Sequence, residues 1–92
     1  MKNNEVINIM KKEIEKSGYR YKFRQSKISD SVYFTIYGAC ASLYFRISDH
    51  KTYKNVVTFR VDRKTDHKKV LNFIKQRIKD VNTRNVCSLL GV

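Results

Sequence analysis

Two short runs in the middle of the chain, residues 32–37 and 43–48, alternate strictly between two kinds of side chain. One kind is aliphatic or Phe: Val32, Phe34, Ile36, Leu43, Phe45 and Ile47. The other kind is Tyr, Thr, Arg or Ser: Tyr33, Thr35, Tyr37, Tyr44, Arg46 and Ser48. Alternation with a period of two predicts antiparallel strands buried on one face only. We therefore expect an apolar face that packs on a core and a second face rich in Tyr and Arg.

Two further runs show the same alternation. Residues 19–24 place Tyr and Phe at odd positions and Arg or Lys at even positions. Residues 55–62 place Val57, Phe59 and Val61 between Thr58, Arg60 and Asp62. Two polar segments and one segment of small residues, 38–42, separate the four runs, and such segments predict turns or loops. The sequence thus predicts four strands joined by short hairpin connections.

Helical periodicity occurs near both ends of the chain. In residues 3–16, Val6, Met10 and Ile14 follow a spacing of four, and Gly18 suits a left-handed C-cap. A second helix is predicted from Thr65 as N-cap, with Asp66 in its first turn. Its apolar stripe consists of Val70, Ile74, Ile78 and Val81. The periodicity ends after Val81, so residues 83–92 are expected to be a tail that docks on the core or frays.

These elements predict an α+β fold in the order α-β-β-β-β-α. We expect a four-stranded antiparallel sheet with both helices packed on its apolar face. Residues 1–92 are expected to form a single domain. No run approaches the roughly 18 apolar residues of a membrane span, and the N-terminal residues lack the apolar core of a signal peptide. A cytoplasmic protein is therefore expected.

The charge of the chain points to an anionic partner. Twenty Lys and Arg residues face eight acidic residues, which gives a net charge of +12. Such an excess favours nucleic acid, an acidic protein or an anionic membrane surface as partner. The alternative is a basic surface that serves only solubility. We expect DNA or RNA, or an acidic or nucleic-acid-bound host protein, and no membrane.

The open face of the predicted sheet is the candidate binding site. Alternation assigns eight residues to it: Arg20, Lys22, Arg24, Tyr33, Tyr37, Tyr44, Arg46 and Arg60. Bases of single-stranded nucleic acid stack on Tyr rings, and Arg and Lys contact phosphates. Two other interpretations stay open. The face could bind a target protein or a second copy of the chain, because Tyr and Arg are enriched in interfaces. Alternatively, the cross-strand pairs only stabilise the sheet.

Catalytic and metal-binding patterns are sparse. Cys40 and Cys87 are far apart and are expected to be reduced thiols without zinc. His50 is expected in a polar loop, where a solvated role is commoner than general-base catalysis. We expect no enzyme activity, no metal and no cofactor.

One short pattern supports the alternative of a small nuclease. Asp49, Asp62 and Lys64 are similar to the carboxylate and D-x-K arrangement of metal-dependent nucleases. In those enzymes two carboxylates hold a divalent ion, and the Lys supports the attacked phosphate. The sequence has no phosphate-binding Gly loop and no Ser-His-Asp arrangement at convincing spacing.

Two resemblances extend this interpretation. Ser31-Val32-Tyr33 followed by Arg46-Ile47-Ser48-Asp49-His50 resembles a pattern in small proteins of phages and mobile elements of low-GC bacteria. That resemblance implies a host-directed factor, such as an inhibitor of a defence nuclease of the anti-CRISPR kind. The order of elements resembles double-stranded RNA-binding domains and HicA-type toxin ribonucleases. We expect a non-enzymatic nucleic-acid-binding protein of a phage or mobile element, with a host-protein inhibitor as the alternative and a nuclease as the third.

Overall fold

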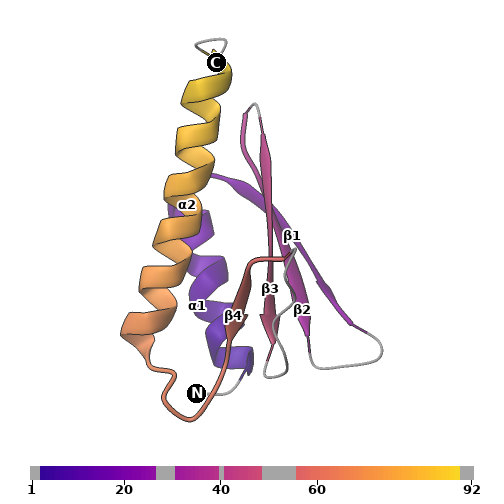
Figure 1. The fold of residues 1–92 in the computed structure, drawn as a ribbon, viewed down its shortest axis with the longest axis vertical. Helices are drawn as coiled ribbons and strands as arrows, with labels where there is room; N and C mark the ends of the chain where they lie inside the picture. The colour runs from indigo at the N-terminus through magenta and orange to yellow at the C-terminus, as the bar shows by residue number, and fades with distance from the viewer. Residues whose placement is uncertain (1–2, 27–30, 40, 49–55, 90–92) are drawn as a thin grey trace.

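A computed structural model of the chain describes residues 3–26, 31–39, 41–48 and 56–89. It contains two helices and four strands (Figure 1). The elements are α1 (Asn3–Lys16), β1 (Arg20–Gln25), β2 (Val32–Tyr37), β3 (Ser42–Ser48), β4 (Thr58–Arg60) and α2 (His67–Leu89). The predicted α+β class and the order of elements are confirmed.

The strands form one sheet in the order β1-β2-β3-β4. β1–β2 and β2–β3 are antiparallel, but β3–β4 is parallel. The prediction of a purely antiparallel sheet is therefore wrong for the last pair. Residues 49–57 make the connection nine residues long, whereas hairpin loops commonly have about two to five. The chain instead enters β4 in the same direction as β3, and β4 is only three residues long.

The apolar side of β2 and β3 is buried as the alternation predicts. Phe34 of β2 lies directly opposite Phe45 of β3, and both side chains are fully buried. The helices add their own stripes to this core. Its helical members are Val6, Met10 and Ile14 of α1, and Val70, Ile74, Ile78 and Val81 of α2.

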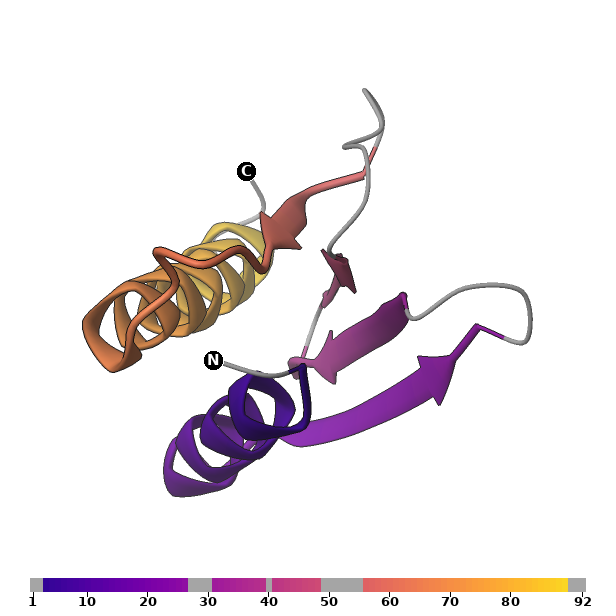
Figure 2. The ribbon, with the colours of Figure 1, turned by 90° about the horizontal axis from the view of Figure 1, so that it is seen from below.

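Both helices lie on the same side of the sheet, and neither covers the opposite side (Figure 2). They do not share the sheet equally. α2 packs on β2 and β3, whereas α1 packs chiefly on α2 and, among the strands, mainly on β1.

The predicted C-cap of α1 is confirmed, and the N-cap of α2 shifts by one residue. Gly18 has a φ of 79°, and its N–H donates to the Glu15 carbonyl at 3.0 Å. At the start of α2, Asp66 rather than Thr65 is the cap, because its carboxylate accepts the Lys69 N–H at 2.8 Å. Thr65 instead closes the preceding turn by accepting the Asp62 N–H at 2.8 Å.

α2 continues to Leu89, well beyond the end of its apolar periodicity. The predicted boundary after Val81 is wrong, because polar contacts hold the last turns and apolar periodicity does not detect them. Arg84 donates to the Ser42 carbonyl at 3.2 Å. Tyr19 donates its hydroxyl proton to Asn82, and Asn85 donates to the Tyr19 hydroxyl oxygen at 3.3 Å. These bonds tie α2 to the start of β1 and to the β2–β3 turn.

Candidate nucleic-acid interface

The side of the sheet away from the helices carries the predicted site residues in register. Antiparallel pairing arranges them in rows across three strands. The rows are Arg24, Tyr33 and Arg46; Lys22, Thr35 and Tyr44; and Arg20, Tyr37 and Ser42. Arg60 pairs with Ser48, which lies two positions from Arg46 and so shares its face. The eight residues therefore lie on one face, as predicted, but they differ in how much of each side chain is exposed.

Three planar groups stack diagonally across this face. The rings of Tyr33 and Tyr44 have centroids 5.8 Å apart and planes 20° apart. The third group is the Arg24 guanidinium, which lies over the Tyr33 ring at 5.2 Å from its centroid. Tyr33 is half-buried between these neighbours, whereas Tyr44 and Tyr37 are 46% and 44% exposed. Tyr44 and Tyr37 thus offer ring surface to a partner, and Tyr33 aligns the stack.

A shallow depression of about 320 Å³ brings these groups together. Its lining consists of Lys22, Phe23, Arg24, Tyr33, Thr35, Tyr37 and Tyr44. A neighbouring depression of about 740 Å³ shares Tyr37 and contains Arg20. The two hollows place Arg20, Lys22 and Arg24 beside the exposed Tyr rings.

Arg46 departs from the prediction, because only 2% of its surface is exposed. Ser31 and Ser48 are also buried on this end of the face, and the Ser31 hydroxyl lies 3.1 Å from that of Ser48. The expectation that Arg46 is open to a phosphate is wrong. Alternation determines the face to which a side chain points, but it does not determine what covers that face. The accessible part of the site therefore comprises the β1 cations, Arg60, Tyr37 and Tyr44.

Phe23 is also among the residues that line the depression, although its ring lies on the helical side of the sheet, as the alternation predicts. Its ring stacks on Phe34 at 5.8 Å, yet 45% of Phe23 is exposed because β1 is the edge strand. The Lys11 ammonium of α1 lies 3.6 Å from the centroid of the Phe23 ring. In the sequence, the exposure of Phe23 is indicated only by the place of residues 19–24 as the first of the predicted strands, at the edge of the sheet.

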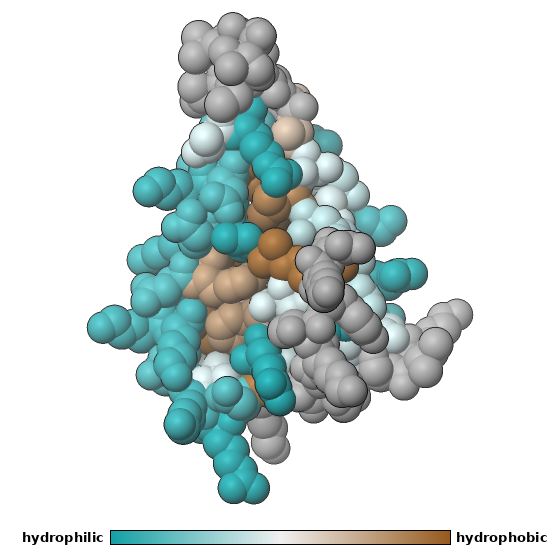
Figure 3. Space-filling model, viewed as in Figure 1, coloured by the Kyte–Doolittle hydropathy of each residue, from teal (hydrophilic) through white to brown (hydrophobic). Residues whose placement is uncertain are grey.

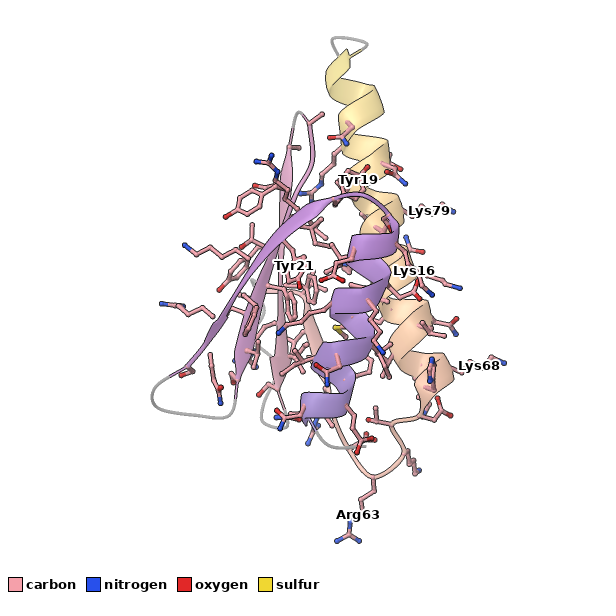
Figure 4. The ribbon with its side chains drawn as sticks, turned by 180° about the vertical axis from the view of Figure 1, so that it is seen from behind. Lys16, Tyr19, Tyr21, Arg63, Lys68 and Lys79 are labelled. Atoms are coloured by element: carbon pink, nitrogen blue, oxygen red, sulfur yellow. The ribbon has the colours of Figure 1, made fainter. Side chains whose placement is uncertain are left out.

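The helical side of the molecule is also basic. Hydrophilic residues line the outward surface of α2, and apolar surface shows between α2 and the strands (Figure 3). Lys68 and Lys79 of α2 project away from the sheet (Figure 4). These two residues lie on the outward surface of α2, away from the rings of Tyr33, Tyr37 and Tyr44. They therefore provide internal controls for the Tyr-containing face.

Of the residues on which the nuclease alternative depends, the structure describes Asp62 and Lys64. Asp49 and His50 lie outside the described residues. The Asp62 carboxylate accepts the Lys64 N–H at 2.8 Å, and this bond holds the pKa of Asp62 below its ordinary value. That carboxylate therefore organises the turn before α2. Across the described ranges, no three His, Cys, Asp or Glu side chains are grouped as metal ligands would be.

Comparisons of the chain with protein-family models, curated proteins and solved structures give no match. Neither helix, over the part of the chain that the structure describes, combines the length and the apolar character needed to cross a membrane.

Proposed function

We propose that the chain binds single-stranded nucleic acid on the open face of its sheet, without catalysing a reaction. The observation that carries this proposal is the depression in which Tyr33, Tyr37 and Tyr44 lie beside Lys22 and Arg24. Exposed aromatic rings among cations are the combination that single strands require, because unpaired bases stack while phosphates remain accessible. A phage or mobile element is the proposed source.

Each part of the site has a distinct role in this proposal. Bases stack on Tyr37 and Tyr44, whose rings are the most exposed. Tyr33 holds the Tyr44 ring in place through the stack with Arg24. The phosphates contact the exposed cations, namely Arg20, Lys22, Arg24 and Arg60. Arg46 is buried at one end of the face and therefore does not contact the ligand.

Replacing Tyr44 by Ala tests the stacking role. We expect binding of a labelled single-stranded oligonucleotide to weaken by about 1–3 kcal/mol, since one stacked base is lost. The salt dependence of binding should stay unchanged because no ionic contact is removed. Fluorescence anisotropy over a salt series measures both quantities. Unchanged affinity in a folded Tyr44→Ala variant would contradict the stacking proposal.

Replacing Lys22 by Ala tests the ionic role. With three or four phosphate contacts from the exposed cations, log Kd should change with log salt with a slope of magnitude roughly 2 to 3. Lys22→Ala should reduce that magnitude by roughly 0.7. The matched control is Lys68→Ala, which removes the same charge from the helical side. Equal effects of the two variants would show that charge alone, and not this face, binds.

A host protein is the competing partner for the same face, because exposed Tyr and Arg also favour protein interfaces. Recovery of bound material from lysate, with and without nuclease treatment, separates the two. Loss of all specific partners after nuclease treatment supports the proposal. Nuclease-resistant recovery of one protein, together with no oligonucleotide binding at low salt, would overturn it.

A further inference from the structure

The outer edge of β1 carries backbone groups that no described strand pairs. β1 is the first strand of the order β1-β2-β3-β4, and its one neighbour there is β2. The Ser26 N–H donates to the Ser31 carbonyl at 2.8 Å, which fixes the phase of the β1–β2 ladder. Hydrogen-bonded pairs alternate in an antiparallel ladder, so Arg24, Lys22 and Arg20 also point their backbone groups at β2. The backbone N–H and C=O groups of Tyr21, Phe23 and Gln25 therefore point outward.

The side chains along this edge are of two kinds on two faces. Arg20, Lys22 and Arg24 are exposed on the open face. On the helical side Phe23 is 45% exposed and Tyr21 is half-buried, with its hydroxyl 2.9 Å from the Glu15 carboxylate. The β1 edge thus offers cations on one side, aromatic surface on the other, and between them backbone groups that no described strand pairs.

We propose that the β1 edge binds an extended segment of another protein in which acidic and apolar residues alternate. The segment adds a strand to the sheet, and main-chain bonds to Tyr21, Phe23 and Gln25 hold it. Its acidic side chains pair with the three cations of β1, and its apolar side chains cover Phe23. This site goes beyond the proposed nucleic-acid face, because its affinity depends on backbone pairing.

Charge complementarity selects this occupant over a second copy of the chain. Pairing of two β1 strands would place the cations of one copy beside those of the other, and like charges directly opposite destabilise a sheet. Cations on an edge strand are a known protection against such self-pairing. The same cations attract an acidic strand. The Lys11 ammonium over the Phe23 ring adds to the positive charge at this edge.

Synthetic peptides test the proposal on the unmodified protein. The probe is a capped peptide of about eight residues in which Glu and Val alternate, and binding is measured by calorimetry. A peptide of the same composition with its Glu and Val in two blocks is the control. We expect the alternating peptide to bind roughly tenfold tighter or more. Equal affinity of the two peptides, or no binding of the alternating one, would overturn the proposal.

Methylated peptides test the backbone bonds. In the antiparallel arrangement, the Val amides face β1 and the Glu amides face away. N-methylation of the Val amides should therefore lower affinity roughly tenfold, whereas N-methylation of the Glu amides should leave it within roughly twofold. A loss confined to either set supports strand addition. Equal losses in both sets would show that the peptide binds by charge only.

A pair of protein variants tests the hydrogen bond that the outward N–H of residue 23 donates to the peptide. Phe23→Pro and Phe23→Ala both remove the ring, but only Phe23→Pro removes the outward N–H. Proline is tolerated at an edge position whose N–H faces solvent. We expect Phe23→Pro to bind the alternating peptide several-fold more weakly than Phe23→Ala, with circular dichroism confirming that both fold. Equal binding by the two folded variants would contradict the proposal, and the methylated peptides decide it if Phe23→Pro fails to fold.

Discussion

Replacing Phe45 by Ala is expected to lower the free energy of unfolding by about 3–5 kcal/mol. Phe45 is fully buried, and its ring stacks on Phe34 with centroids 5.2 Å apart. Phe73 of α2 meets the same ring edge-on at 5.5 Å. The variant therefore opens a cavity where the sheet meets α2. For a domain whose stability lies near the lower end of the usual range of about 5–15 kcal/mol, this loss is large enough to populate the unfolded state.

The control for Phe45 is its neighbour in the sequence, because Tyr44 points to the opposite face. Tyr44→Ala removes the stack with Tyr33 and should cost only about 1 kcal/mol of stability. Urea denaturation followed by circular dichroism compares the two midpoints. A larger loss in Tyr44→Ala than in Phe45→Ala would mean that the two faces of the sheet are reversed.

Replacing Gly38 by Ala is expected to destabilise the fold by about 3 kcal/mol, because no space exists for a side chain. A Cβ at this position would lie 2.6 Å from both the Ala41 carbonyl oxygen and the Asn85 side chain. It would also lie 2.8 Å from a methyl group of Val81. The β2–β3 turn and α2 therefore approach so closely at Gly38 that one of them has to move.

Gly18 provides a matched comparison for this effect. A Cβ there would meet nothing within 4 Å, but the φ of 79° disfavours other residues. Gly18→Ala should cost about 1–2 kcal/mol, and Gly18→Asn less, because Asn tolerates the left-handed conformation. At Gly38 the Asn variant should be at least as damaging as the Ala variant. Thermal unfolding of the four variants would contradict the packing argument if Gly38→Ala matched the unsubstituted protein.

Local periodicity predicted the parts of the fold that depend on one element at a time. Period two identified the buried side of β2 and β3, and the spacing of Val6, Met10 and Ile14 identified the buried side of α1. Gly18 was recognisable because its position after the last apolar residue matches a common helix end. These features need only the chain's own geometry, so the sequence is sufficient for them.

Features that depend on the meeting of two elements were not predictable in this way. The direction of β4 relative to β3 depends on the course of the connection and not on the alternation within β4. The burial of Arg46 depends on what covers its face, and the length of α2 depends on polar contacts of Asn82 and Arg84 with distant segments. The candidate site was therefore predicted as a set of residues on one face, while the burial of Arg46 and the exposure of Phe23 at the edge of the sheet required the structure.

The dependence of the core on α2 has a consequence for the time course of folding during synthesis. α2 contributes Val70, Ile74 and Val81 to the core and is made after every strand. A ribosome that adds roughly 5–20 residues per second needs on the order of seconds to produce this helix. Throughout that interval the apolar surfaces of α1 and the sheet have no cover from α2, and exposed apolar surface of this kind promotes aggregation. The nascent chain should therefore complete its fold in one late step, and a chain stalled before α2 should be a substrate for chaperones and proteases.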